Sequence, residues 1–299
     1  MPLRRLTLFL VIASLSIVAV GQVEDDTVIA VDSSMVVMNA TITDRNNSNV
    51  AGLKKEQFSI FEDGVQQQIV FFEAEETPFA AVILLDSSGS MEERISLARA
   101  AAIRFLDGLR ATDSAAIYRF DSEVNLVQDF SNSRDVTERI FDVKSYGMTV
   151  LNDAVYKAAK DLETRPEKRR AIIVLSDGAD TMSGRSADAA LKAALAANAV
   201  IYTVDMSSPE ASAKQKMESA GALKKFAAKS GGTYVSSPGG VAMREAFEKI
   251  VGELGVQYTL GFSPSNLKKD GKWRDLEIRV ARPNLTIRTR KGYHAVKAK

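Results

Sequence analysis

The stretch VILLDSSGSMEER, residues 82–94, has the pattern of a buried strand that runs directly into a polar turn and a helix. Apolar residues at successive positions are typical of a strand covered on both faces, as in a parallel sheet. Asp86 ends the apolar run, and Ser88 and Ser90 follow at alternate positions. In open parallel sheets, ligands bind at the carboxyl ends of the strands. The stretch therefore predicts a layered α/β fold with a polar site at one sheet edge.

Further apolar runs repeat this pattern through the middle of the chain. The strand candidates are 80–85, 115–120, 171–175 and 199–204. Between them, apolar residues recur at the spacing of a helix face. The helix candidates are 95–109, 151–162, 186–198, 214–229 and 241–252. The alternation predicts a doubly wound, mostly parallel sheet with helices on both faces.

The flanking segments have β character instead. Strand-like runs occur at 35–43, 58–61, 67–72, 256–262, 274–280 and 285–290. Neither flank holds enough strands to be stable alone. We therefore expect residues 28–76 and 253–299 to pair into one β-sandwich-like domain, with the α/β domain inserted between them. The expected domain limits are 1–21, 22–78, 79–252 and 253–299.

The first 21 residues have the pattern of a secretory signal peptide. Arg4 and Arg5 precede an uncharged apolar run, and Ala19 and Gly21 supply small residues at the cleavage spacing. The apolar run is short of the roughly 20 residues that a membrane span needs, although an uncleaved anchor is the alternative. We expect cleavage after Gly21, no membrane span afterwards, and a periplasmic or secreted protein.

Composition narrows the function. The chain has 39 basic and 38 acidic residues, a balance that gives no indication of a nucleic-acid partner. It has no cysteine and one histidine, which excludes thiolate chemistry, disulfides and mechanisms that need two histidines. The sequence contains no nucleophile elbow, phosphate-binding loop or zinc-protease motif. We therefore expect a protein that is not an enzyme.

Two more polar clusters stand beside the same sheet. Asp177 follows the strand candidate at 171–175, and Thr149 precedes the helix that starts near Leu151. Together with the first cluster they offer two carboxylates and three hydroxyls, an all-oxygen set that suits Mg²⁺, Mn²⁺ or Ca²⁺. Two carboxylates leave a divalent ion near neutrality. If one of them binds only through water, the ion favours a carboxylate from outside as its last ligand.

Each cluster also has a purely structural interpretation. Ser90 stands three residues before Glu93, so it could be the N-cap of a capping box. Asp177 and Gly178 could form only a turn, and Thr149 could cap the helix that follows it. Capping and metal binding are compatible, since a serine can cap through one lone pair.

Residues 79–252 resemble the von Willebrand factor type A domain with its metal-ion-dependent adhesion site. The motifs that carry the resemblance are Asp86-Ser-Ser-Gly-Ser90-Met, Thr149 with Leu151 and Asp153-Ala154, and Ser176-Asp177-Gly178-Ala-Asp180. The resemblance implies that one divalent cation, Mg²⁺ in first place, is held by Asp86, Ser88, Ser90, Thr149 and Asp177, some of them through water. Asp153 and Asp180 would be supporting residues. Met148 departs from the family pattern, because many relatives carry a second glycine there.

The whole chain looks like the exported bacterial proteins built around such a domain. We expect a metal-dependent protein-binding module, for adhesion or as a scaffold, whose ion grips an acidic residue of a partner protein. The alternatives are a structural envelope subunit with a vestigial site and a metal-dependent hydrolase. The sequence has no second aspartate close after Asp86 and no evident general base, and both absences argue against the hydrolase.

Overall fold

The computed structural model describes residues 35–74, 77–133, 140, 143, 147–208, 210, 212–236 and 240–297. The expected signal peptide, residues 1–21, lies outside this range and stays a prediction. Within the described residues, no helix is long and apolar enough to span a membrane.

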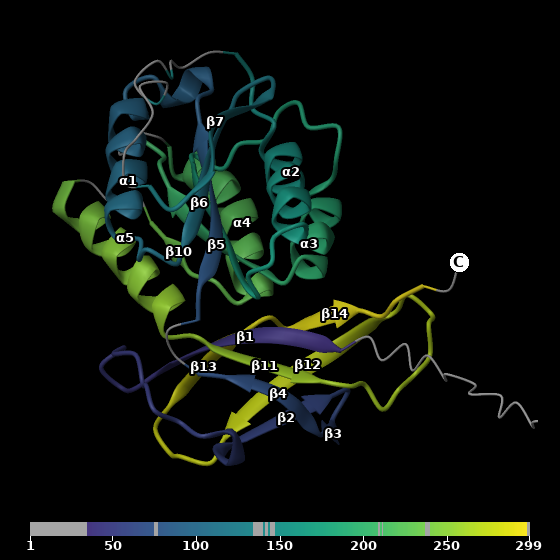
Figure 1. The fold of residues 1–299 in the computed structure, drawn as a ribbon. Coiled ribbons are helices and arrows are strands. Elements are labelled where there is room, and N and C mark those ends of the chain that lie inside the picture. Colours follow the sequence, from purple (N-terminus) through teal and green to yellow (C-terminus); the bar gives the residue numbers. More distant parts are fainter. Residues whose placement is uncertain are drawn as a thin grey trace, which may run out of the picture. The chain divides into compact units, whose positions relative to one another are not determined.

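A six-stranded sheet forms the centre of the α/β part, in the order β10-β9-β8-β5-β6-β7 (Figure 1). Its strands are β5 (Phe79–Asp86), β6 (Ser114–Phe120), β7 (Val124–Ser131), β8 (Arg169–Ser176), β9 (Ala199–Asp205) and β10 (Tyr234–Val235). Only β7 runs antiparallel, against β6. The predicted mostly parallel sheet is confirmed, and the two edge strands β7 and β10 are the ones that the sequence did not predict.

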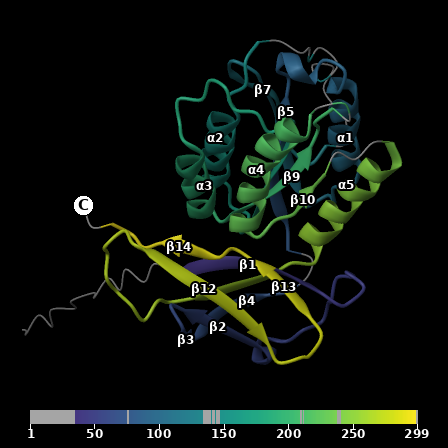
Figure 2. The same ribbon diagram turned by 180° about the vertical axis from the view of Figure 1, so that it is seen from behind.

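Five helices cover the sheet. They are α1 (Ile95–Asp107), α2 (Leu151–Glu163), α3 (Ala187–Ala196), α4 (Ala213–Ser230) and α5 (Gly240–Gly255). Helices α1 and α5 lie on one face, and α2, α3 and α4 lie on the other (Figures 1 and 2). Successive residues of β5 therefore pack into two different cores: Ile83 with α1 and α5, and Leu84 with the other three helices. This is why the strand is apolar from Phe79 to Leu85.

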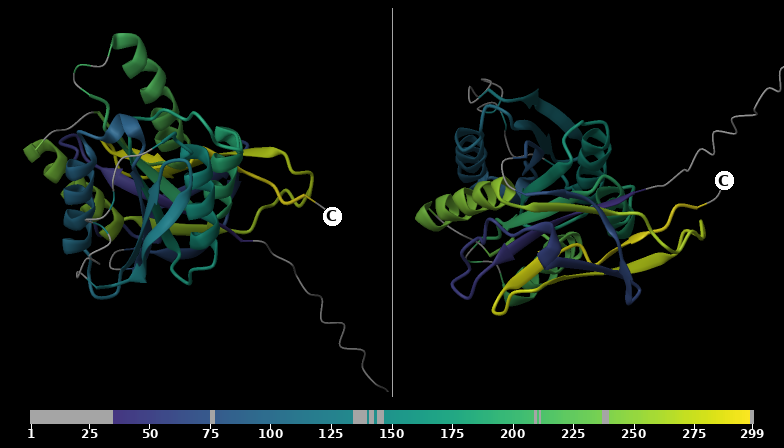
Figure 3. Two further views of the ribbon diagram at one scale, coloured as in Figure 1. Left: turned by 90° about the horizontal axis from the view of Figure 1, so that it is seen from above. Right: turned by 60° about the horizontal axis from the view of Figure 1, so that its bottom comes forward.

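The flanking segments form two four-stranded antiparallel sheets, with orders β13-β1-β11-β4 and β14-β12-β2-β3. Figure 3 shows the purple N-terminal strands beside the yellow C-terminal strands. The strands are β1 (Val36–Thr43), β2 (Phe58–Glu62), β3 (Val65–Gln67), β4 (Ile69–Glu73), β11 (Tyr258–Phe262), β12 (Trp273–Val280), β13 (Thr286–Thr289) and β14 (Gly292–His294). β1 pairs with β11 and β13, and β2 pairs with β12. The predicted pairing of the N-terminal and C-terminal segments around an inserted α/β part is confirmed.

The expected domain limits stay predictions, but helix α5 crosses the one expected at residue 252. Helix α5 continues to Gly255, three residues past the expected limit at 252. Its last carbonyl groups lie beyond the reach of helical hydrogen bonds, as at every helix C-terminus. Arg169 supplies the missing donor: its Nη1 donates to the carbonyls of Leu254 and Gly255 at 3.4 and 3.3 Å. Its Nε donates to Thr259 Oγ1 at 3.1 Å, so one buried side chain joins β8, α5 and β11.

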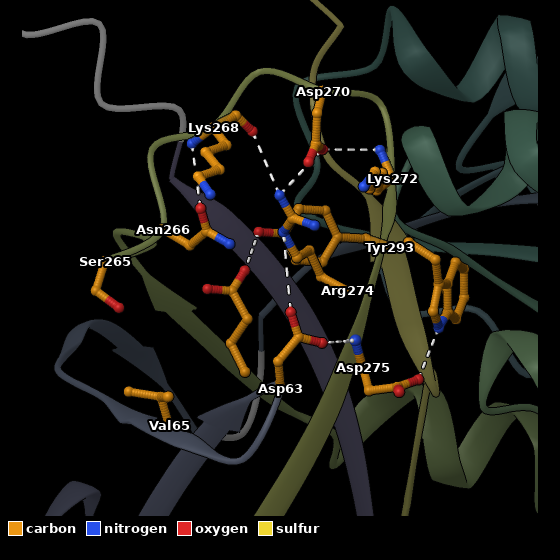
Figure 4. A network of polar contacts seen from close by, with 12 residues as sticks. Asp63, Val65, Ser265, Asn266, Lys268, Asp270, Lys272, Arg274, Asp275 and Tyr293 are labelled. Carbon is orange, nitrogen blue, oxygen red and sulfur yellow. Dashed lines mark hydrogen bonds and ion pairs between the residues drawn. The ribbon is translucent and has the colours of Figure 1, made fainter.

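A second buried arginine orders the long connection between β11 and β12 (Figure 4). Arg274 is only 5% exposed and donates to Asp270 Oδ1 at 3.0 Å and to the Lys268 carbonyl at 3.4 Å. Asp63, in the turn between β2 and β3, lies 3.9 Å from the same guanidinium and accepts the backbone N–H of Asp275 at 2.8 Å. The connection is therefore held by one buried cation that has two hydrogen-bond acceptors in the connection and a carboxylate of the β2–β3 turn nearby.

Two glycines give a matched test of the packing between α4 and β9. A Cβ added at Gly232 would lie 2.0 Å from the Ile201 carbonyl oxygen, whereas at Gly221, inside α4, it would meet nothing within 4 Å. We expect Gly232→Ala to lower the free energy of unfolding by about 2 kcal/mol or more, because the backbone must move apart. Gly221→Ala should raise it by about 0.5–1 kcal/mol. Urea unfolding measures both, and equal stabilities would contradict the close approach.

Candidate functional site

The carboxyl ends of β5 and β8 lie side by side. The two strands are parallel neighbours, with Leu85 beside Leu175. The side chain of Ser176 donates to Asp86 Oδ2 at 2.5 Å, and the backbone N–H of Gly178 donates to the Ser176 hydroxyl at 2.9 Å. Ser176 therefore joins the cluster of Asp86 to the loop of Asp177, although the sequence prediction did not assign this serine to the site.

Ser88 and Ser90 fold back toward Asp86. The backbone N–H of Ser88 donates to Asp86 Oδ1 at 2.9 Å, and the hydroxyl oxygens of Ser88 and Ser90 are 3.1 Å apart. Both lie at a short 3-10 turn, η2 (Gly89–Met91), and not at the start of a helix. Helix α1 begins later, and its cap residue Arg94 makes no side-chain cap bond in the described part of the chain. The alternative in which Ser90 caps the helix is wrong, because the 3-10 turn separates the two.

Thr149 belongs to the same edge through its backbone. The N–H of Gly89 donates to the Gly147 carbonyl at 3.2 Å, which joins the first loop to the loop of Thr149. The Thr149 carbonyl accepts from the N–H groups of Thr181 and Met182 at 3.0 and 3.1 Å, and its own N–H donates to Thr181 Oγ1 at 3.0 Å. Three loops that are far apart in sequence thus form one bonded unit.

Helix α2 is capped from outside. Asp180 Oδ2 accepts the N–H of Asn152 at 2.8 Å, and the Ser183 hydroxyl accepts the N–H of Asp153 at 3.1 Å. Val150 occupies the cap position without a side-chain cap bond among the described residues. The alternative in which Thr149 caps the helix is therefore also wrong, because the loop after β8 already satisfies the helix terminus.

The two predicted supporting residues, Asp153 and Asp180, connect the loop after β8 to helix α2. Asp153 accepts the backbone N–H groups of Gly184 and Arg185 at 2.8 and 3.1 Å, and the Arg185 guanidinium at 3.1 Å. Asp180 also accepts from the hydroxyl of Ser183 at 2.8 Å. Both carboxylates join the loop after β8 to the start of α2, and their oxygens accept hydrogen bonds from groups of the protein itself.

Three residues of this unit were missed from the sequence: Ser176, Thr181 and Ser183. Ser176 could have been found, because it is the last residue of a buried strand directly before Asp177. Thr181 and Ser183 carry no such signal, since their partners are about 30 residues away and only the fold brings them together.

The turn interpretation of Asp177 is correct as far as it goes. Gly178 has a positive φ of 83°, and Asp177 Oδ1 accepts the N–H of Ala179 at 3.2 Å. Asp177 is nevertheless half-buried at the end of β8, and one side-chain bond leaves acceptor capacity on its carboxylate. The turn and a ligand role are therefore compatible here.

The charge of the site is uncompensated within the described chain. Asp86 is fully buried, and burial raises its pKa to about 7 against the lowering effect of the hydrogen bonds from Ser176 and Ser88. No ion pair among the described residues includes Asp86 or Asp177. A buried carboxylate is costly unless a proton or a cation neutralises it. The donor set of carboxylates and hydroxyls fits a hard divalent cation.

Comparison with known families agrees with this geometry. Residues 81–179 match the family model of the von Willebrand factor type A domain. This part of the chain is a von Willebrand factor type A domain. The match spans all five predicted ligands, from Asp86 to Asp177, and ends just before Asp180.

Several solved structures are similar to the chain, whereas no curated protein matches it. BatB from Bacteroides thetaiotaomicron is 17% identical over 59% of this chain and 98% of its own, with a TM-score of 0.46. The PilB minor pilin from Streptococcus sanguinis is 13% identical over 61% of this chain and 62% of its own, with a TM-score of 0.47. A von Willebrand factor type A protein from Catenulispora acidiphila is 15% identical over 89% and 75%, with a TM-score of 0.48.

Two substitutions separate capping from ligand binding. Asp180→Ala removes the acceptor for the N–H of Asn152 and should lower the stability of the metal-free protein by about 1 kcal/mol. Thr149→Val removes a hydroxyl that caps nothing and keeps the volume, so it should cost less than about 0.5 kcal/mol under the same conditions. Chemical unfolding in EDTA measures both. The reverse order of the two effects would show that Thr149 is the structural cap.

Proposed function

We propose that this chain is a metal-dependent protein-binding module of an exported bacterial protein, acting in adhesion or as a scaffold. One divalent cation, Mg²⁺ in first place with Mn²⁺ or Ca²⁺ as alternatives, would be held by Asp86, Ser88, Ser90, Thr149 and Asp177. The observation that carries the proposal is a fully buried carboxylate beside a set of oxygen donors, which forms no ion pair with a cationic side chain among the described residues.

The residues of the proposed site differ in how deeply they are buried. Asp86 and Ser88 are buried and fixed by hydrogen bonds, so they would form the floor of the site. Ser90 and Met148 are exposed, so the site would open on their side. When bound, the cation supplies a Lewis-acidic centre to which a carboxylate oxygen of a partner protein can bind. Two carboxylates from the chain leave a divalent ion near neutrality, which accommodates a third carboxylate from outside.

The departure at Met148 does not distort this arrangement. Met148 is absent from the residues with positive φ, so its backbone does not require glycine, whereas the neighbouring Gly147 has a φ of 67°. A Cβ at Gly147 would lie 2.6 Å from the Ser122 hydroxyl. The loop therefore keeps its glycine at the position where the geometry demands one.

Metal binding is tested by thermal unfolding with and without Mg²⁺. At a concentration 100 times the dissociation constant, the ion should stabilise the wild type by about 2.7 kcal/mol and raise Tm by about 5 °C or more. Asp86→Ala should abolish the shift while the protein still folds. Asp107→Ala, which removes an exposed carboxylate at the end of α1, is the matched control and should keep the shift. Absence of any shift with Mg²⁺, Mn²⁺ and Ca²⁺ would favour a structural subunit with a vestigial site.

Partner chemistry is tested with a displayed peptide library in which each aspartate or glutamate peptide has an asparagine or glutamine counterpart. The acidic peptides should be retained in Mg²⁺ and released in EDTA, and Asp86→Ala should retain neither set. Equal retention of acidic and amide peptides would reject a carboxylate as the last ligand. Turnover of a phosphate ester that disappears in Asp86→Ala would favour the hydrolase instead.

A further inference from the structure

A small cavity lies at the far side of the molecule from the metal centre, between β1, the chain after β13, α3 and β9. Its open volume is about 10 Å³, room for the centre of one water-sized species. The polar side chains in its wall are Asn39, Asn198, Ser230 and Arg290. The cavity therefore has room for a single small polar occupant.

Two of these side chains carry buried donors without a partner in the described structure. They are Asn39 Nδ2 and Arg290 Nε, on residues that are 5% and 6% exposed. The Thr259 hydroxyl donates to Asn39 Oδ1 at 3.0 Å, and it accepts from Arg169 Nε at 3.1 Å. The atom of Asn39 that has no partner is its N–H donor, Nδ2.

The remaining polar atoms of the wall are already engaged. Arg290 Nη1 donates to the Leu195 carbonyl and to Asn198 Oδ1, both at 3.0 Å, and Nη2 donates to the Val37 carbonyl at 2.6 Å. The Ser230 hydroxyl accepts from the Ile201 N–H and donates to the Phe226 carbonyl, both at 2.8 Å. Asn39 Nδ2 and Arg290 Nε are thus the two donors of the wall that lack a partner in the described structure.

The guanidinium of Arg290 also lacks a counter-charge. All of its acceptors are neutral, and none of the ion pairs formed by the described residues includes it. Burial lowers the pKa of Arg290 to about 10, the direction expected for a cation without a neighbouring anion. A buried charge is costly unless it is paired.

We propose that the cavity binds one chloride ion between Asn39 Nδ2 and Arg290 Nε. A halide accepts hydrogen bonds and donates none, which matches two free donors. It would also neutralise the buried guanidinium. A water molecule could also fill the volume, but it would leave the charge of the buried guanidinium unpaired. The ion would join β1 to the chain after β13, and it would neutralise the guanidinium whose Nη1 reaches the Leu195 carbonyl of α3.

The direct test is a crystal of the full chain grown in sodium bromide. An anomalous bromide peak within hydrogen-bonding distance of Asn39 Nδ2 and Arg290 Nε is expected. An empty cavity, or density without anomalous signal that refines as water, would overturn the proposal. This measurement uses the wild type, so it does not depend on any variant folding.

A solution test uses thermal unfolding at constant ionic strength while chloride replaces gluconate. Tm should rise by about 3 °C for each tenfold increase in chloride above the dissociation constant. Asn39→Asp places a fixed carboxylate in the cavity and should remove this dependence. Asn46→Asp adds the same charge in an exposed loop and should keep it. An identical Tm in chloride and gluconate, or a response retained in Asn39→Asp, would overturn the proposal.

Discussion

The burial of the Asp86 carboxylate is the constraint on which the site depends. Strand β5 is covered on both faces, so its last residue lies within the protein although it ends a strand at the sheet edge. A carboxylate in this position needs hydrogen bonds and a compensating charge. The protein supplies the hydrogen bonds, from Ser176 and Ser88. The described residues do not supply the charge, and this separates the site from an ordinary buried ion pair.

The rigidity of the site comes from bonds between loops that are distant in sequence. Asp180 and Ser183 cap helix α2 from the loop after β8, and Asp153 returns the contact from the helix to that loop. The arrangement leaves Thr149 without a capping task. Asp153 and Asp180 therefore hold the loops together, and the Thr149 hydroxyl is not needed as a helix cap.

Two buried arginines, one at the start of β8 and one after β13, present the same problem with the opposite charge. Arg169 begins β8, and Arg290 follows β13; both are buried and both donate only to neutral oxygens. These donors satisfy the last carbonyls of α5 and join the sandwich strands to the α/β part. Among the described residues, the Asp86 carboxylate thus belongs to no ion pair, and neither do the guanidinium groups of Arg169 and Arg290. Both situations favour small ions from solution.

The sequence by itself determined the layered α/β fold, because uninterrupted apolar runs such as 80–85 are typical of strands covered on both faces. It also determined the pairing of the flanks, because neither flank holds enough strands to be stable alone. It did not show β7, whose half-exposed residues alternate irregularly at a sheet edge. It also suggested helix caps at Ser90 and Thr149 that are wrong. Sequence spacing describes local bonds, whereas the actual cap of Asn152 is Asp180, 28 residues away. Which oxygens stay available beside Asp86 was therefore decided only by the tertiary structure, through bonds between loops that have no local signal.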